Sequence, residues 1–447
     1  MDKKIFGILT ALFLGLVVFG VMFLLLPIKQ ALFLGLIASL VALWTNEALP
    51  LGVVSLLPII LFPMLDINTT NEVSNQYSKS IIFLFLGGFM LAIAVEKTEL
   101  HKVIAHKILR LFPRTIRGIV YALTITSGIL SSCLSNTTTT LLLIPLAIYL
   151  TEDKVLKLRF ALAVAYGSSI GGILTPIGTA PNLILLGIFD AKGIESITFM
   201  QWIIMVFPLA TIMFVVVGYI LSLGLKHHKL DLMKPQKDIS RHQKRVLIVL
   251  VGLFILLLVN SPFKPFYNGL GFNEKGILLA AGLLMFFPPL SILKWEDSKK
   301  IPFEIIFLFG AGFSIALGFT STGLADTLAS LLMGFTQLPP VILLALVAGL
   351  VTFTTEITSN TALTSMLLPV IYAICIKANL DKSLFMMVAT ISASYAFMLP
   401  IATPPNAIAM SSGVVPVKSM MKFGVLFNFI GIFFVTLVAI SYWNYML

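Results

Sequence analysis

The sequence Ser135-Asn136-Thr137 occurs a second time as Ser359-Asn360-Thr361, 224 positions further along the chain. Each copy lies inside an otherwise apolar stretch. A polar segment rich in helix-breaking residues follows each copy at the same distance, Gly-Thr-Ala-Pro-Asn at 178–182 and Ala-Thr-Pro-Pro-Asn at 402–406. Because both pairs share one spacing, we expect the four pieces to meet in one binding site.

The composition excludes a soluble protein. The chain has 447 residues, of which 58% are hydrophobic and 11% charged, whereas soluble domains are about 25% charged. Apolar runs of about 20 residues are long enough to span a bilayer. The net charge of +11 is explained by basic loops, so no nucleic acid partner is expected. Cys133 and Cys375 do not correspond under the 224-residue offset, which argues against a disulfide or metal framework.

The predicted fold is therefore an all-α polytopic membrane protein with about eleven transmembrane helices. The segment 5–26 follows two lysines but is too long for a signal peptide, so it is predicted to be the first of them. Two further apolar stretches, 118–150 and 338–376, hold the Ser-Asn-Thr copies and either cross twice or return as re-entrant hairpins. The other predicted segments are 29–47, 48–65, 80–99, 160–189 (interrupted), 200–225, 244–261, 274–292, 303–324, 383–412 (interrupted) and 420–446.

Loop charges orient this layout. With the N-terminus in the cytoplasm and the C-terminus outside, 23 of the 30 Lys and Arg fall inside. The seven on the outside are thinly scattered: Lys29, Lys79, Lys192, Lys264, Lys275, Lys377 and Lys382. This asymmetry follows the positive-inside rule.

The 224-residue offset extends beyond the motifs. Ten of the twenty residues in 81–100 are identical to their counterparts in 305–324. Each repeat makes an odd number of crossings, which inverts the second copy relative to the first. Inverted repeats with interrupted helices at matching positions point to a transporter site near the middle of the bilayer.

Polar side chains within uncharged apolar windows are the candidate ligands for ions and substrate. Hydroxyl and amide oxygens suit a hard cation such as Na⁺, while free N–H groups at helix ends suit an anion. Prolines interrupt both of these helices, which leaves backbone N–H and C=O groups without helical partners. Within a membrane such groups must line a cavity or be buried in protein. Packing between helices is the competing interpretation, and it is favoured at Ser132, Thr139, Thr140 and Ser168. For Glu356, the only acid in 327–376, an ion-site role and a structural hydrogen bond remain equally open.

With the paired Ser-Asn-Thr motifs, the segment 394–406 (Ser-Tyr-Ala-Phe-Met-Leu-Pro-Ile-Ala-Thr-Pro-Pro-Asn) closely resembles the divalent anion/sodium symporter (dicarboxylate/sulfate carrier) family. The resemblance covers nearly the whole chain. It implies a homodimer in the bacterial cytoplasmic membrane, in which a scaffold holds a transport domain that moves like an elevator. Each Ser-Asn-Thr would sit at the tip of a re-entrant hairpin.

The resemblance also implies the site residues. One Na⁺ site would use Ser131, Ser135, Asn136 and the carbonyl of Gly178; the second would use Thr355, Thr358, Asn360 and the carbonyl of Ala402. A dianionic carboxylate substrate would meet Asn136, Thr137, Ser359, Asn360, Thr361, Thr179 and Thr403. Na⁺ is the only expected cofactor, with no organic cofactor.

The chain then divides into an N-terminal transmembrane helix (1–27), a first repeat (28–226), a cytoplasmic linker (227–243) and a second repeat (244–447). The expected parts of the first repeat are scaffold helices 28–99, an amphipathic interfacial arm 100–117, the hairpin 118–150, the interrupted helix 160–189 and a helix 200–225. Those of the second are scaffold helices 244–324, an arm 325–338, the hairpin 339–376, the interrupted helix 383–412 and a helix 420–446.

Sodium-coupled symport of dicarboxylates (the succinate, malate and fumarate class) is the favoured function, because the oxygen-bearing positions expected of the cation sites are retained. The nearest alternatives are a sodium-independent dicarboxylate exchanger and a sulfate or citrate carrier. An ion channel would leave the anion donors unexplained. An enzyme is not expected, because no catalytic dyad or metal-ligand cluster lies within the predicted spans.

Overall fold

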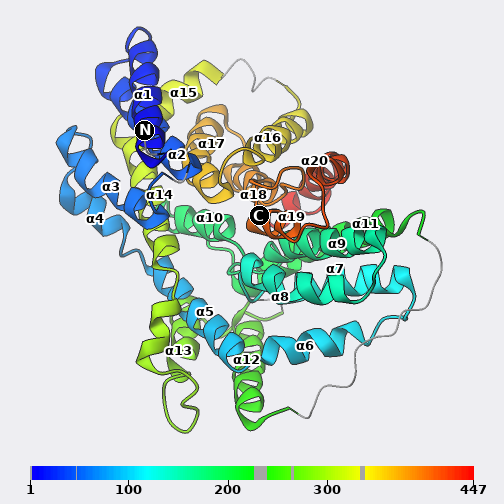
Figure 1. Cartoon of the computed structure of the whole chain (residues 1–447). Coiled ribbons are helices and arrows are strands. Elements are labelled where there is room, and N and C mark those ends of the chain that lie inside the picture. Colours follow the sequence, from blue (N-terminus) through cyan, green and yellow to red (C-terminus); the bar gives the residue numbers. More distant parts are fainter. Residues whose placement is uncertain (1–2, 47, 226–238, 263–265, 333–337) are drawn as a thin grey trace.

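The computed structural model describes residues 3–46, 48–225, 239–262, 266–332 and 338–447, and the described chain is built from helices (Figure 1). In chain order they are α1 (Lys3–Phe23), α2 (Ile28–Asn46), α3 (Leu51–Met64), α4 (Thr70–Gln76), α5 (Ser80–Lys97), α6 (Leu100–Leu109), α7 (Ile116–Ser131), α8 (Asn136–Tyr149), α9 (Lys154–Gly172), α10 (Ala180–Ala191), α11 (Phe199–Ser222), α12 (Arg241–Asn260), α13 (Glu274–Leu284), η1 (Trp295–Lys300), α14 (Phe303–Ser321), α15 (Leu324–Leu332), α16 (Pro340–Thr355), α17 (Asn360–Ala378), α18 (Lys382–Ala393), α19 (Pro404–Ser411), α20 (Val417–Ser441) and η3 (Trp443–Tyr445).

Within the described residues, eight helical stretches are long and apolar enough to cross a membrane. They comprise α1, α2, the stretch 70–97 that holds α4 and α5, and then α11, α12, α14, α17 and α20. Six shorter apolar helices, α3, α7, α8, α10, α16 and α18, together with α9 and α19, account for the remaining predicted segments except 274–292. The prediction of an all-α, multi-pass membrane protein is confirmed.

The 224-residue offset recurs in the helix termini. Helix α7 begins at residue 116 and ends at 131, and α16 begins at 340 and ends at 355. Helices α8 and α17 likewise begin 224 residues apart, at Asn136 and Asn360. Equivalent sequences in the two halves of the chain therefore fold into equivalent local structures.

The two halves interlock. Helix α10 of the first half packs against α17 and α18 of the second, while α19 of the second half packs against α8 and α9 of the first (Figure 1). Phe85 and Phe309, which are 224 residues apart, stack with their ring centroids at 4.5 Å. Neither half could bury its short helices without the other, so this packing brings the motifs of both halves to the centre of the molecule.

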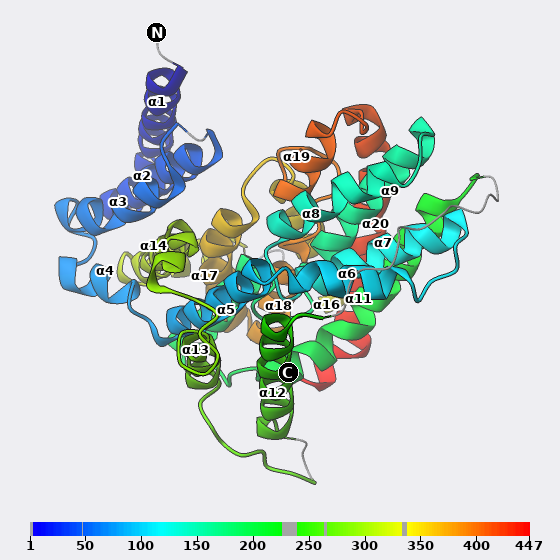
Figure 2. The ribbon, with the colours of Figure 1, turned by 60° about the horizontal axis from the view of Figure 1, so that its bottom comes forward.

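Helix α1 projects from one corner of the molecule and packs along α2 (Figure 2). The two backbones approach so closely that a Cβ on Gly35 would lie 2.7 Å from the carbonyl oxygen of Gly15. Small residues permit this approach between membrane helices. Much of the outer side of α1 is apolar and exposed, including Phe13 and Leu16, as suits a surface that faces lipid.

The arm expected over 100–117 is shorter in the structure. Helix α6 ends at Leu109, and α7 begins at Ile116 after Thr115, whose hydroxyl caps the new helix. His101 is buried and its Nδ1 lies 3.2 Å from the carbonyl oxygen of Val95. Leu111 is 80% exposed because it lies beyond the helix end. Burial of His101 lowers its pKa.

Two other expected segments differ or lie partly outside the described residues. Helix α13 ends at Leu284, short of the expected 292, and the prolines at 288 and 289 supply no backbone N–H to continue it. Most of the linker 227–243, and residues 333–337 of the second arm, lie outside the described part of the chain. The short helix α4 escaped sequence analysis, although Thr69 and Glu72 form a capping box at its start.

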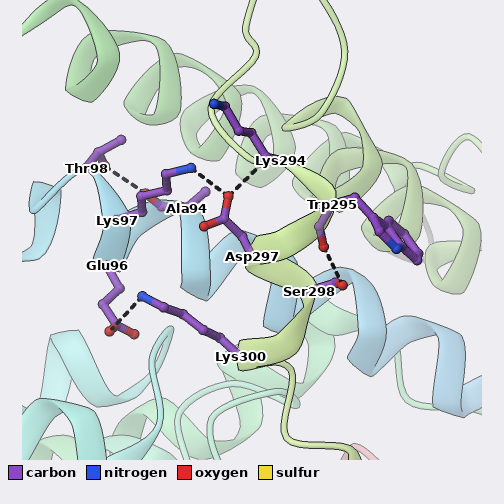
Figure 3. Close-up of polar contacts among 9 residues, drawn as sticks. All are labelled: Ala94, Glu96, Lys97, Thr98, Lys294, Trp295, Asp297, Ser298 and Lys300. Carbon is purple, nitrogen blue, oxygen red and sulfur yellow. Dashed lines mark hydrogen bonds and ion pairs between the residues drawn. The ribbon is translucent and has the colours of Figure 1, made fainter.

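A cluster of ion pairs joins the end of α5 to η1 (Figure 3). Lys97 Nζ lies 2.6 Å from Asp297 Oδ2, and Lys300 Nζ lies 3.9 Å from Glu96 Oε1. The same Asp297 oxygen accepts the backbone N–H of Lys294 at 2.7 Å. The bonds from Lys294 and Lys97 lower the pKa of Asp297. The cluster thus connects the two halves of the chain next to the arm helix α6.

Candidate functional site

Each Ser-Asn-Thr motif lies at a helix start. Ser135 and Ser359 are the N-cap residues of α8 and α17, and each hydroxyl accepts the backbone N–H three residues on, at 3.1 and 3.5 Å. Asn136 and Asn360 are then the first helical residues. The N–H groups of a first turn have no partner within the helix, so each motif presents donors together with amide and hydroxyl oxygens at the tip between two helices.

The first interrupted helix breaks between α9 and α10, over residues 173–179. Asn182, at the start of α10, is fully buried. Its Nδ2 donates to the carbonyl oxygens of Gly172 at 3.1 Å and Thr175 at 2.9 Å. One amide therefore satisfies two of the carbonyls that the break frees, as buried backbone groups require.

The second break, over residues 394–403, separates α18 from α19. Asn406 Nδ2 donates to the carbonyl oxygens of Ala396 and Leu399, both at 3.0 Å. All three residues lie 224 positions after those of the first break. The asparagine that ends each polar motif thus holds the break together. Both asparagines belong to the polar motifs found in the sequence, but this role was not predicted for them.

A cavity of about 160 Å³ lies between the tips, the breaks and helices α5 and α14. Six predicted site residues from both halves of the chain line it: Ser135, Asn136, Gly178, Thr179, Asn360 and Thr361. The opposite wall is apolar and includes the stacked Phe85 and Phe309, together with Phe89. Among the described residues that line the cavity, none carries a charge.

The other predicted residues lie beside the cavity rather than in its lining. Thr403 is buried at the N-cap of α19, where its hydroxyl accepts the N–H of Asn406 at 3.4 Å. Ala402 is buried immediately before it. The remaining members of this group belong to the hairpin tips: Ser131, Thr137, Thr355, Thr358 and Ser359.

A chain of oxygens connects the first tip to α9. Ser131 Oγ donates to Asn136 Oδ1 at 2.5 Å and lies 3.0 Å from Ser168 Oγ. Ser168 Oγ donates in turn to the carbonyl oxygen of Asn136 at 3.2 Å. Ser168 was predicted to be a packing residue, and only its polarity within an apolar window indicated a role at the site.

Two glycines allow this cluster to close. A Cβ on Gly172 would lie 2.8 Å from Asn136 Oδ1, and one on Gly178 would lie 2.4 Å from the carbonyl oxygen of Gly172. The structure therefore brings together Ser131, Asn136 and the backbone of Gly178, three of the four ligands predicted for the first cation site. The Ser135 hydroxyl is engaged in capping α8 and also donates to Thr138 Oγ1 at 2.8 Å.

The second tip is built differently. Thr355 Oγ1 donates to the carbonyl oxygen of Ala393, at the end of α18, at 3.1 Å. Thr361 Oγ1 donates to Asn360 Oδ1 at 3.1 Å. Thr358 Oγ1 bonds back to the carbonyl oxygen of Thr354 at 2.8 Å, so its hydroxyl serves its own helix end.

Glu356 stands next to this second group. It is 2% exposed, and its carboxylate accepts the N–H groups of Met398 and Leu399, each at 2.9 Å, and Asn428 Nδ2 at 2.7 Å. All three partners are donors. An ion-site role and a structural hydrogen bond were both left open for Glu356. The structure shows the hydrogen bonds, which hold the backbone of the second break.

The donor set suits an alkali cation. It consists of hydroxyl, amide and carbonyl oxygens, the hard ligands that such ions prefer. Across the described residues, His, Cys, Asp and Glu nowhere gather in a group of three or more that could bind a transition metal. In the structure Ser131 Oγ is joined to Asn136 Oδ1 and Ser168 Oγ by hydrogen bonds of 2.5 and 3.0 Å, and a bound cation would take the place of these hydrogen bonds.

Comparison with known proteins identifies the family. A family model described as "Citrate transporter" (CitMHS) matches residues 40–375. The sodium-dependent dicarboxylate transporter SdcS of Staphylococcus saprophyticus is 32% identical over 89% of this chain and 83% of its own length. SdcS of Staphylococcus aureus (strain MRSA252) is 30% identical over 98% of this chain and 92% of its own length.

Two solved structures share the fold. The YdaH transporter of Alcanivorax borkumensis superposes with a TM-score of 0.58 at 16% identity, covering 93% of this chain and 98% of that one. MtrF of Neisseria gonorrhoeae, described as representing a class of antimetabolite efflux pumps, gives a TM-score of 0.60 at 11% identity, covering 94% and 95%. The chain therefore belongs to the divalent anion/sodium symporter (CitMHS) family, and it is a secondary transporter rather than an enzyme.

Proposed function

We propose that the protein couples the uptake of a C4 dicarboxylate to the entry of Na⁺ across a bacterial cytoplasmic membrane. The observation that carries this proposal is the cavity, where Asn136 and Thr179 of the first repeat face Asn360 and Thr361 of the second. Neutral amide and hydroxyl donors at helix starts suit carboxylate oxygens. The named activity of the SdcS relatives, sodium-dependent dicarboxylate transport, supports it.

Bound Na⁺ would compensate the negative charge of the substrate in this site. A dianion would enter a cavity whose described lining has no Lys or Arg. Bound Na⁺ beside Asn136 and Asn360, together with the positive ends of α8 and α17, would supply the missing positive potential. Sodium should therefore bind before the substrate and raise its affinity.

The proposed topology follows the repeat. Helices α7–α8 and α16–α17 form two re-entrant hairpins, each of which returns to its side of entry, and α9–α10 and α18–α19 form two interrupted crossings. The second repeat is inverted relative to the first. With the N-terminus in the cytoplasm, the ion-pair cluster of Lys97 and Asp297 lies on the inner side, where basic residues concentrate.

The elevator motion fits the two-sided cavity. The polar side consists of hairpin tips and breaks, which would travel together as a transport domain. The other side consists of Phe85, Phe89 and Phe309 from the scaffold helices α5 and α14. Apolar contact is non-directional, so the polar side can slide past this wall without exchanging hydrogen bonds. A homodimer would hold the two scaffolds still in the membrane.

Uptake of labelled succinate into proteoliposomes tests the proposal. We expect uptake to require external Na⁺, to be lost when choline replaces it, and to proceed without dicarboxylate inside. Uptake in choline that depends on internal dicarboxylate would identify a sodium-independent exchanger instead. Single-channel currents would identify a channel.

Citrate is the second candidate substrate, because the family model that matches residues 40–375 is described as a citrate transporter. Competition of labelled succinate uptake by citrate, malate, fumarate and sulfate ranks the candidates. Inhibition by malate and fumarate at concentrations well below those needed for citrate supports the C4 assignment.

A further inference from the structure

The strongest polar feature outside the cavity lining is the anchorage of the second break by Glu356. Its two carboxylate oxygens accept the backbone N–H groups of Met398 and Leu399. Asn428 on α20 reinforces this contact, because its Nδ2 donates to Glu356 Oε1 at 2.7 Å while its Oδ1 accepts the N–H of Phe397 at 3.2 Å. Three consecutive backbone N–H groups of the break are thereby satisfied by two side chains.

Helix α20 is shaped to hold this network. A Cβ on Gly424 would lie 2.2 Å from the carbonyl oxygen of Phe397, and one on Gly431 would lie 2.8 Å from the ring of Tyr395. Gly424, Asn428 and Gly431 recur at helical spacing on one face. The break therefore rests on a helix face that admits its backbone and offers one amide to it.

The first repeat makes the same connection with different chemistry. Residues 132 and 175 are the counterparts of 356 and 399, and they are also in contact: Thr175 Oγ1 donates to the carbonyl oxygen of Ser132 at 2.5 Å. Each hairpin tip is thus tied to its own break at the same place. In the first repeat the tie is neutral, whereas in the second it carries a carboxylate.

That carboxylate is placed to act on a cation. Among the buried polar side chains of the described residues, Glu356 is the only carboxylate. It adjoins Thr355 in sequence and precedes Asn360 by four residues, and both of these are proposed ligands of the second Na⁺ site. A negative charge in a poorly solvated region acts strongly on a nearby cation. The first site has only the Ser132 hydroxyl at the equivalent position.

We propose that Glu356 is a positioning residue that fixes the second break. Through its charge, it gives the second cation site a higher affinity for Na⁺ than the first. This inference rests on the proposed sodium coupling. It predicts that the two pseudo-equivalent sites are unequal, with the second filled at the lower Na⁺ concentration.

The test compares Glu356→Gln with wild type and with Ser132→Ala, the substitution at the equivalent position of the first repeat. Two readouts are taken on purified protein: the rise in unfolding temperature as NaCl replaces KCl, and succinate uptake as a function of Na⁺ in proteoliposomes. For Glu356→Gln we expect the half-saturating Na⁺ concentration to rise at least about tenfold in both readouts. The maximal uptake at saturating Na⁺ should fall less than the Na⁺ affinity, and Ser132→Ala should match wild type.

Glu356→Asp separates charge from reach, and it decides the matter if Glu356→Gln does not fold. The shorter acid keeps the charge but cannot meet both N–H groups, so we expect slower maximal uptake with a half-saturating Na⁺ concentration within about twofold of wild type. An unchanged Na⁺ response in Glu356→Gln, or a tenfold shift in Glu356→Asp, overturns the inference. A wild-type protein that transports succinate equally in choline overturns the proposed sodium coupling itself, which is a different result.

Discussion

Replacing Asn406 by Ala removes the amide that donates to the carbonyls of Ala396 and Leu399. Asn406 is fully buried, so water cannot substitute for it. The carbonyl of Leu399 keeps the N–H of Ala402 at 3.2 Å, so the carbonyl of Ala396 is the one left without this partner, at a cost of about 1–3 kcal/mol. That is a large share of the ~5–15 kcal/mol that stabilises a typical folded protein.

The equivalent asparagine of the first repeat provides a second test of the same prediction. Asn182 makes the same two bonds at the first break, so Asn182→Ala should lose a similar amount. Asn406→Leu keeps the branched shape but cannot donate to either carbonyl, so it should be no better than alanine. Asn75→Ala, at an exposed position on α4, is the matched control and should stay within about 0.5 kcal/mol of wild type.

Thermal unfolding in detergent, followed by tryptophan fluorescence and checked by size-exclusion chromatography, measures these differences. The reasoning fails if Asn406→Ala and Asn182→Ala both unfold at the wild-type temperature. It also fails if Asn406→Leu restores the stability that alanine loses, because that would mean that side-chain volume rather than hydrogen bonding holds the break.

Three further predictions concern the cavity and the ion-pair cluster. Asn136→Ala and Asn360→Ala should each lower succinate uptake at least about a hundredfold while leaving a folded protein of unchanged size on a gel-filtration column; normal uptake in either would remove the site assignment. Cys133 is exposed and lines the cavity, whereas Cys375 is buried, so a membrane-impermeant thiol reagent should block uptake in wild type, succinate should slow the block, and Cys133→Ser should be resistant. The lowered pKa of Asp297 means that its ion pair stabilises the fold above the ordinary Asp pKa of about 3.9 and loses that effect as pH falls through the lower folded value; wild type and Asp297→Asn should therefore differ in unfolding temperature at pH 7 and converge in strong acid.

The fold class and the core of the site were predictable because both depend on local pattern. Apolar runs of membrane length are visible in any single chain, and the duplicated Ser-Asn-Thr fixes a register that the helix termini then follow. Asn136, Thr179, Asn360 and Thr361 were found this way, and all four line the cavity. A polar residue within an apolar window is conspicuous, and its duplication at one spacing argues against chance.

The contacts of Glu356 and Ser168 could not be read from the sequence. Glu356 is bonded to backbone N–H groups 42 and 43 residues away and to Asn428, 72 residues away. A backbone N–H is present at almost every residue, so the sequence does not show which one will meet Glu356. Asn428 is a single polar residue in the apolar middle of α20. Ser168 reaches Asn136 across 32 residues of chain. Such partners are set by how the helices pack, which the repeat alone does not specify.

The two repeats agree where the fold needs them to agree and differ where the chemistry of the two sites diverges. Asn182 and Asn406 make the same pair of bonds to the same equivalent carbonyls, because any break in a buried helix leaves the same backbone groups to satisfy. Residues 132 and 356 occupy equivalent positions, and each ties its own hairpin tip to its own break. Ser132 does so through its backbone carbonyl and Glu356 through its carboxylate. On the proposal that each tip holds Na⁺, this pseudo-symmetric scaffold would carry two unlike cation sites, because the charge that separates them belongs to a residue outside the shared motif. The proposal then predicts an ordered pair of binding events, with the glutamate-assisted site filled first.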